Sequence, residues 1–325
     1  MILFVTGQYA SGQYLHPLLK LWEGKVSNEW ELVATGPSCG YWDKFGVPYK
    51  TIKDNSPMTV ASYIKSLKPS VIMVSASANI DLEHVFITEA RKALVPSACF
   101  IDTWINYRPR FQYQGKLLLP DHVLAIDDRC ADELVADRIP EKVIHIVGQP
   151  YLEEVAFTVP ALGPNTLLVS QPISKNQWRN LGYDEKDFYK VCIKAVNKLG
   201  MSNIYGTRHP DESVNAHMPD SSSVVWVEGK DALDVASSHT LLGMFSMQMI
   251  IGYLWGRKVA SVQPKLNMDD PSPLSRWGLI PRLEKVEEII DFINERDVKV
   301  CDEGFKNNLA GSLDRFESFC LGESI

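Results

Sequence analysis

The stretch between residues 202 and 263 constrains the fold more than any other part of this chain. It holds three short apolar runs, within 204–210, 224–229 and 241–246, and each run leads at once into small or polar residues. A parallel strand that is buried on both faces and delivers a functional loop has this pattern. Because the carboxyl ends of parallel strands meet at one edge of a sheet, the stretch predicts a ligand crevice there. The polar side chains offered at that crevice suit a phosphate and a ribose: Arg208, His209, Asp231, Thr240 and Ser246.

Strand-like and helix-like segments alternate along the rest of the chain. The other expected strands are 2–6, 31–34, 71–75, 98–101, 122–126, 143–147, 166–170 and 258–262. The first expected helix carries Leu15, Leu18, Leu19 and Trp22. The other expected helices are 60–67, 82–93, 129–136, 185–199, 232–237, 247–255, 284–294 and 305–320. Such alternation predicts an α/β protein built on doubly wound parallel sheets.

The chain is long enough for two domains, and its composition changes once near the middle. Residues 157–165 contain two prolines and a glycine with little periodicity, which predicts a linker. We therefore expect a first domain over 1–156 and a second over 166–304. A last helix within 305–325 is expected to pack back across the first domain.

Composition and charge exclude several classes of protein. With 45% hydrophobic and 22% charged residues, the chain is typical of a soluble globular protein. Its net charge of −7 and the lack of a basic block argue against nucleic acid as the main partner. The six scattered cysteines predict buried free thiols in a reducing compartment. With no signal-like start and no apolar run of about 20 residues, we expect a cytoplasmic protein and leave peripheral membrane association open.

Asp102 is the strongest candidate for chemistry in the first domain. It directly follows the predicted strand 98–101, and a partly desolvated carboxylate there suits proton transfer from an alcohol. The alternative is a structural carboxylate that pairs with Arg108 or Arg110. Should Asp102 not be the proton acceptor, the next candidates are His16, Glu83 and His84.

Other polar residues at strand ends have simpler interpretations beside the functional ones. Residues 75–78 are small and polar, which makes them a second candidate crevice loop. The Asp127-Asp128 pair precedes a predicted helix, so the helix dipole explains it better than a metal. Ser246 begins a predicted helix, where it can cap the helix or help to bind phosphate.

The residues around His209 predict an anion site. His209 precedes Pro210, which biases its backbone away from helix, and an imidazolium there could neutralise a phosphate. The alternative is a histidine that packs against its own loop. Arg208 either adds a second phosphate contact or pairs with Asp211.

Together these motifs resemble the two-domain GT-B glycosyltransferases, and within them the bacterial lipooligosaccharide sialyltransferases and polysialyltransferases. The resemblance rests on His209-Pro210 within 207–212, on Ser246 at the end of 242–246, and on Asp102 within 101–104. Ser170-Gln171-Pro172, after the first strand of the second half, is similar as well. The resemblance implies two Rossmann-like domains of GT-B type, with a C-terminal helix that packs back on the first.

The resemblance also implies a function and a set of roles. The expected activity is inverting transfer of a CMP-activated nonulosonic (sialic-type) acid to a glycan acceptor, in bacterial surface polysaccharide biosynthesis. Asp102 would be the general base, and His209 would stabilise the leaving phosphate. No cofactor or metal is expected besides the nucleotide-sugar donor. The remaining donor contacts would be Arg208, Pro210, Glu228, Asp231, Thr240 and Ser246, and the acceptor side would be Gln8, Tyr9, Trp104 and Tyr107.

Two alternatives keep the fold and change the function. A UDP-sugar 2-epimerase or a nucleotide-sugar hydrolase would need further acid or base carboxylates at one sugar, and the sequence does not identify them. A non-catalytic sugar-nucleotide-binding protein would need none.

Overall fold

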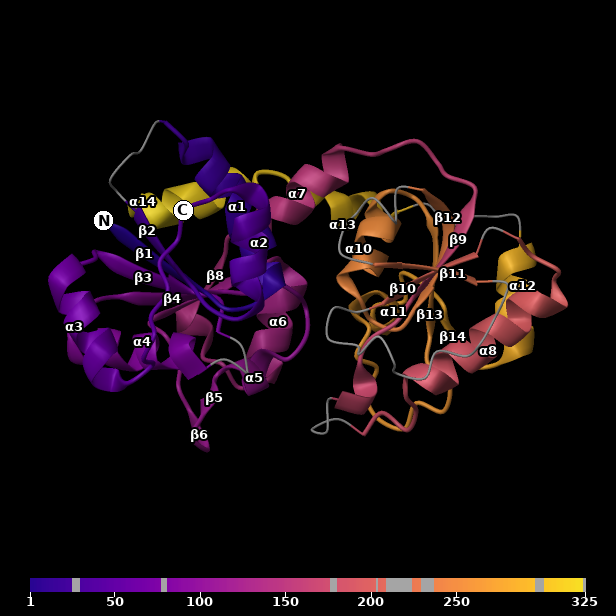
Figure 1. Ribbon diagram of the computed structural model, residues 1–325, viewed down its shortest axis with the longest axis horizontal. Helices are drawn as coiled ribbons and strands as arrows, with labels where there is room; N and C mark the ends of the chain where they lie inside the picture. The colour runs from indigo at the N-terminus through magenta and orange to yellow at the C-terminus, as the bar shows by residue number, and fades with distance from the viewer. Residues whose placement is uncertain are drawn as a thin grey trace. The chain divides into compact units, whose positions relative to one another are not determined.

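The computed structural model describes residues 1–24, 30–76, 81–175, 180–202, 204–208, 224–228, 237–295 and 301–323, and the chain divides into two compact units (Figure 1). Unit 1 comprises Met1–Glu154 and Asn307–Ile325, and unit 2 comprises Val155–Lys306. Each unit is built around a six-stranded sheet in which every strand pair is parallel.

The sheet of unit 1 has the strand order β2-β1-β3-β4-β7-β8. Its strands are β1 (Ile2–Thr6), β2 (Trp30–Ala34), β3 (Val71–Val74), β4 (Ser97–Phe100), β7 (His122–Ala125) and β8 (Ile144–Ile146). Every residue of β1 and β4 is buried, as expected for strands covered on both faces. The chain leaves β1 for β2 and then returns to β3 on the other side of β1, so the topological switch point lies between β1 and β3.

Helices cover both faces of this sheet (Figure 1). They are α1 (Tyr9–Trp22), α2 (Pro37–Phe45), α3 (Pro57–Leu67), α4 (Asp81–Lys92), α5 (Tyr107–Arg110), α6 (Asp128–Ala136) and α14 (Ser312–Leu321), together with the 3-10 turn η1 (Glu141–Val143). Helix α1 packs against α2 and α14, whereas α3 packs against α4. Helix α7 (Pro150–Phe157) begins in this unit and runs past its boundary.

Helix α14 closes the core of unit 1. Its Phe316 is fully buried and lies edge-on to the Tyr14 ring of α1, with ring centroids 5.1 Å apart. Its Glu317 Oε1 accepts a hydrogen bond from Trp22 Nε1 at 2.6 Å. The expected C-terminal helix that packs back on the first Rossmann-like unit is confirmed.

The sheet of unit 2 has the strand order β11-β10-β9-β12-β13-β14. Its strands are β9 (Asn165–Val169), β10 (Ile204–Arg208), β11 (Val224–Glu228), β12 (Ser238–Gly243), β13 (Lys258–Val262) and β14 (Arg282–Leu283). The chain moves outward from β9 to β11 and then returns to β12 beside β9. The switch point of this sheet therefore lies between β9 and β12.

Unit 2 has its own hydrophobic core, which includes Leu168, Phe188, Leu242, Val262 and Ile289. Its helices are α8 (Glu185–Lys198), α10 (Met247–Leu254), α11 (Pro273–Arg276), α12 (Val286–Asn294) and α13 (Glu303–Asn307), with the 3-10 turn η2 (Ile173–Lys175). Helix α8 packs against α12.

The structure differs from the expected elements at several places. Helices α2, α7 and α11 and the short strand β14 were not expected, and β12 begins before the expected apolar run 241–246. Residues 232–236 of the expected helix 232–237 lie outside the described residues. The predicted final helix is split into α13 and α14, because Gly311 adopts a φ of +71° just before α14 and breaks the helical path. The segment after Asn106, where no helix or strand was expected, forms α5 and a small hairpin of β5 (Gln112–Tyr113) and β6 (Lys116–Leu117).

Tyr14 tests how strongly unit 1 depends on its buried polar contacts. Its ring stacks on Phe100 at 4.5 Å, and its hydroxyl donates to the carbonyl oxygen of Gly148 at 2.9 Å. Tyr14→Phe should lower the free energy of unfolding by about 1–3 kcal/mol, because the buried carbonyl loses its partner. Tyr49→Phe, which removes an exposed hydrogen bond to Asp43, is the control and should cost less. Equal urea midpoints for both variants would contradict this.

His145 should make the stability of unit 1 depend on pH. Burial lowers the pKa of His145, and neighbouring His122, whose Nδ1 lies 3.0 Å from His145 Nε2, lowers it further. The unfolded chain then binds a proton more readily than the folded one. Stability is complete above the ordinary histidine pKa of about 6.5 and is lost as pH falls through the lowered value. His145→Gln should reduce the drop in Tm between pH 7.5 and pH 5, and an unchanged drop would contradict the argument.

Candidate functional site

Polar side chains gather at the carboxyl edge of the sheet in unit 1. Gln8 follows β1, Ser75 follows β3, Asp102 follows β4, Asp127 follows β7 and Gln149 follows β8. Because all these strands are parallel, the five residues lie along one edge. Ligands bind at this edge in open α/β sheets.

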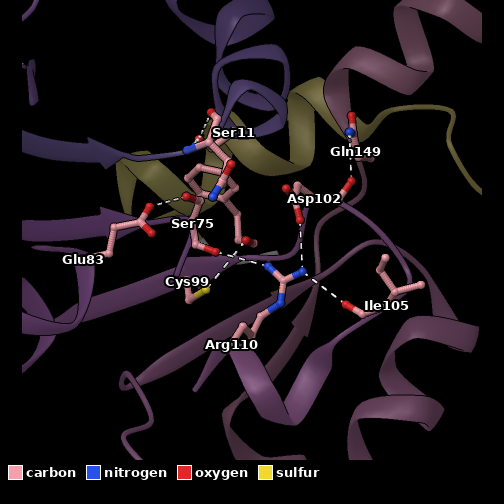
Figure 2. A network of polar contacts seen from close by, with 10 residues as sticks. Ser11, Ser75, Glu83, Cys99, Asp102, Ile105, Arg110 and Gln149 are labelled. Atoms are coloured by element: carbon pink, nitrogen blue, oxygen red, sulfur yellow. Dashed lines mark hydrogen bonds and ion pairs between the residues drawn. The ribbon is translucent and has the colours of Figure 1, made fainter. Parts of the chain in front are cut away.

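Asp102 forms a buried ion pair with Arg110 (Figure 2). Asp102 Oδ1 accepts from Arg110 Nη2 at 3.1 Å, and the two side chains are 12% and 7% exposed. The pairing that the sequence left as an alternative is therefore observed, and with Arg110. Arg108 instead donates to the carbonyl oxygen of Asp137 at 3.2 Å.

The ion pair does not exclude a chemical role for Asp102. Burial lowers the pKa of Arg110, but the charge and hydrogen bond of Asp102, together with the nearby Cys99 and Cys130, raise it overall, so the guanidinium stays charged. It engages only Oδ1 of the carboxylate. Within the described ranges no hydrogen bond is made to Asp102 Oδ2, which is therefore the oxygen able to accept a proton.

Asp127 is a second carboxyl group on the neighbouring strand end. It caps α6, with Oδ1 accepting from Cys130 N and from Trp104 Nε1, both at 2.8 Å. Asp127 thus lies at a helix N-terminus, as the sequence indicated. Burial raises the pKa of Asp127, which favours its protonated form. Its Oδ2 is buried and has no hydrogen-bond partner among the described residues.

The residues expected on the acceptor side fall into two groups. Gln8 and Tyr9 are half-buried at the start of α1, where Gln8 N donates to Ser11 Oγ at 3.1 Å. Trp104 is fully buried, and Tyr107, only 5% exposed, donates its hydroxyl to Glu133 at 2.7 Å. The structure thus brings Gln8 and Tyr9 to the ligand edge and packs Trp104 and Tyr107 into the interior beside it.

The alternative proton acceptors have defined places. His16 is half-buried on α1 with Nδ1 2.9 Å from the Tyr41 hydroxyl, and burial lowers the pKa of His16. Glu83 and His84 are buried at the start of α4. Glu83 accepts a hydrogen bond from Ser75, which lies at the end of β3. Of the candidate crevice loop 75–78, residues 77 and 78 lie outside the described residues.

Ser246 lies beside the switch point of the sheet in unit 2. It caps α10, its Oγ accepting from Gln248 N at 3.3 Å, and the first turn of α10 has no acidic residue. In contrast, the cap of α8 is Asp184, and acidic residues fill its first turn. The positive end of the α10 dipole therefore has no local carboxylate, which suits it to a phosphate. Ser170, after β9, lies at the same switch point and is 3% exposed.

The other donor-side residues are only partly brought together. Arg208 and Glu228 are the last residues of β10 and β11 and are in register with each other at the carboxyl edge. Thr240 is in register with Lys258 and Thr166, near the starts of their strands, so it lies at the amino edge, away from Ser246. His209, Pro210 and Asp231 lie outside the described residues.

The sequence did not predict a polar network that follows β13. Gln263 Nε2 donates to Asp270 Oδ1 at 2.6 Å and to Ser261 Oγ at 2.9 Å, and Gln263 Oε1 accepts from Tyr183 at 3.2 Å. The available signal was the polar Gln263 directly after the predicted strand 258–262. The network fixes the loops that follow β9 and β13 at the ligand edge.

Metal-binding clusters and membrane-spanning helices are both absent from the described ranges. No three His, Cys, Asp or Glu side chains in these ranges gather so that they could hold a metal ion. No helix in the same ranges combines the length and the apolar character that crossing a bilayer demands.

Solved structures match the chain over nearly its whole length, although no protein-family model and no curated protein matches it. A UDP-GlcNAc 2-epimerase from Methanocaldococcus jannaschii has a TM-score of 0.69 at 13% identity, covering 98% of this chain and 99% of that one. A UDP-GlcNAc 2-epimerase from Neisseria meningitidis bound to UDP-GlcNAc has a TM-score of 0.69 at 12% identity, covering 99% and 100%. A lipopolysaccharide outer core galactosyltransferase, in its apo form, has a TM-score of 0.57 at 10% identity, covering 99% of each.

The chain has the GT-B fold that these epimerases and transferases share. The fold expected from the sequence, two parallel Rossmann-like units with a C-terminal helix, is confirmed. The resemblance to sialyltransferases in particular stays a prediction.

Ser246 offers a test that separates helix capping from phosphate binding. Ser246→Asp should keep the cap, since serine, asparagine and aspartate cap about equally well. It should weaken nucleotide binding by roughly tenfold or more, because a carboxylate repels phosphate. Ser246→Asn, the neutral isostere, should bind within a few-fold of wild type. Calorimetry with UDP and CMP measures the nucleotide affinity of both variants. Equal affinities for the two would show that the phosphate does not bind at Ser246.

Proposed function

We propose that the chain is an enzyme that acts on a nucleotide-activated sugar and that its nucleotide is UDP. The observation that carries the proposal is the full-length similarity to UDP-GlcNAc 2-epimerases, whose TM-scores of 0.69 exceed the 0.57 of the galactosyltransferase. Epimerisation at C2 of the sugar is the first candidate reaction. In this proposal the α10 N-terminus with Ser246 binds phosphate, and Arg208 and His209 add positive charge.

Epimerisation at C2 needs proton removal on one face of the sugar and proton return on the other. The sequence makes Asp102 the first candidate for the base, with His16, Glu83 and His84 as alternatives, and identifies no further carboxylate at the sugar. The structure adds Asp127, at the end of the neighbouring strand, with a raised pKa and an unbonded Oδ2 within the described residues. Asp127, whose pKa burial raises, would serve as the acid, and Asp102 would serve as the base. In the proposed reaction Asp102 takes the C2 proton as the C1–O bond to UDP breaks, which leaves a C1–C2 double bond. UDP then adds back to C1 while Asp127 returns a proton to the other face of C2.

Inverting glycosyl transfer is the second candidate. It needs a single base to deprotonate the acceptor hydroxyl, and the free Oδ2 of Asp102 suffices for that step. Gln8 and Tyr9, half-buried at the same edge, would then contact the acceptor. Transfer from a CMP-activated nonulosonic acid is the specific form that the His209-Pro210 and Ser246 motifs favour.

One experiment in D2O separates these reactions. If the protein epimerises UDP-GlcNAc, the C2 proton is replaced by deuterium, which NMR detects in the recovered UDP-sugar. Transfer leaves that proton in place and lengthens a glycan acceptor instead. A protein that binds nucleotide with neither outcome would be a non-catalytic sugar-nucleotide-binding protein. In a thermal-shift comparison, UDP should raise the Tm more than CMP or GDP, and a preference for CMP would favour the second candidate.

Asp102→Asn should lower turnover per folded molecule by roughly 10²–10⁴-fold, the usual contribution of positioned acid–base catalysis. The change also leaves buried Arg110 without its counter-charge, so stability should fall by about 3–5 kcal/mol. Activity must therefore be divided by the folded fraction, measured by circular dichroism at the assay temperature. Near-normal turnover per folded molecule would reduce Asp102 to the structural partner of Arg110.

A further inference from the structure

A chain of buried polar contacts joins helix α4 to the Asp102 carboxylate (Figure 2). Ser75 Oγ donates to Glu83 Oε1 in a short hydrogen bond. The carbonyl oxygen of the same serine accepts from Arg110 Nη1 at 3.2 Å. Arg110 Nη2 then donates to Asp102 Oδ1 at 3.1 Å and to the Ile105 carbonyl oxygen at 3.3 Å. The two terminal nitrogens of the guanidinium, Nη1 and Nη2, thus each have a hydrogen-bond acceptor.

The next residue of α4 holds the same arginine by its backbone. His84 Nε2 lies 2.8 Å from the Arg110 carbonyl oxygen, within hydrogen-bond distance. The His84 ring also stacks on Tyr113 of the β5–β6 hairpin, with ring centroids 5.1 Å apart and an interplanar angle of 2°. Glu83 and His84, consecutive residues of α4, therefore both hold Arg110. Glu83 acts on its side chain through Ser75, and His84 contacts its main chain.

Two carboxyl groups and one guanidinium are ionisable groups of this network. Glu83 is fully buried, and the Arg110 guanidinium lies between the Ser75 that Glu83 holds and the Asp102 carboxylate. Burial raises the pKa of the Cys99 thiol, Arg110 lowers it, and Glu83 and Asp102 raise it, so all three charges act on one buried thiol. The guanidinium pairs directly with the Asp102 carboxylate, and its position depends on the carbonyl oxygens of Ser75 and Ile105 that also accept from it.

We propose that Glu83, Ser75 and His84 are positioning residues that act on Asp102 through Arg110. They hold the guanidinium so that it takes one oxygen of Asp102 and leaves Oδ2 directed at the substrate. The proposal rests on the proposed role of Asp102 in sugar chemistry. A rigidly held base matters because a displacement of about 1 Å can cost on the order of 100-fold in rate.

The kinetic test uses a conservative and a disruptive variant of Glu83. Glu83→Gln keeps an oxygen that can accept from Ser75, so kcat should stay within about threefold of wild type. Glu83→Leu removes that acceptor, and kcat should fall roughly 10- to 100-fold with KM within about twofold, since Glu83 does not touch the substrate. Glu89→Gln, on the same helix but paired with Lys92, is the matched control and should change neither constant. Equal kcat values for Glu83→Leu and Glu89→Gln would overturn the proposal.

A second measurement decides the same question without turnover. Glu83→Leu, Arg110→Met and the double variant form a thermodynamic cycle, with the unfolding equilibrium constant measured in urea. Residues in one hydrogen-bond network should be non-additive by roughly tenfold in that constant. Arg108→Met, on the same short helix as Arg110, replaces it in a control cycle and should be additive with Glu83→Leu. Additivity in the Arg110 cycle overturns the proposal.

The two arms separate this proposal from the proposed function. If the wild-type protein turns over no nucleotide sugar, the proposed function fails, and the cycle alone decides whether α4 holds Arg110. If the wild-type protein is active and the cycle is additive, the positioning role fails and the function stands.

Discussion

The parallel pairing of every strand in both sheets is the constraint on which the rest of the molecule depends. A parallel strand must be followed by a crossover, and the crossovers here carry the helices that bury both faces of each sheet. The same rule sends every strand end to one edge, where polar side chains need not be buried in the core. Each sheet also reverses its winding once, between β1 and β3 and between β9 and β12. The candidate residues Gln8, Ser75, Ser170 and Ser246 all lie at these reversals.

The ion pair of Asp102 and Arg110 is costly for the fold to keep. Removing two charges from water can cost as much as their attraction returns, so such a pair is weak evidence for added stability. It is retained here with further partners, since Arg110 also bonds the Ser75 and Ile105 carbonyl oxygens. A pair that occupies only one carboxylate oxygen orients the other. This arrangement suits proton transfer better than it suits stability, and we therefore propose Asp102 as the proton acceptor.

In unit 2 the feature that suits the proposed phosphate is the dipole of helix α10. The first turn of α10 lacks the acidic residues that fill the first turn of α8, so its positive end has no local carboxylate. Gly243, which precedes this turn, has Val169 and Met249 so close that a Cβ would have to displace them. The loop from β12 into α10 is therefore held tightly against β9. Such a preorganised site needs little rearrangement when an anion binds.

The sequence by itself determined most of the strands and helices, the two-sheet GT-B architecture, and the placing of Asp102 and Ser246 at strand ends. Apolar runs and helix periodicity are local, so they survive without tertiary information. Only the tertiary structure decided that Arg110 rather than Arg108 pairs with Asp102, because that choice depends on where α5 meets Ser75. It also decided that Trp104 is buried, and that β12 starts at Ser238, which takes Thr240 to the amino edge. Partners that meet only across the fold leave no local pattern, since their contacts depend on packing between distant segments.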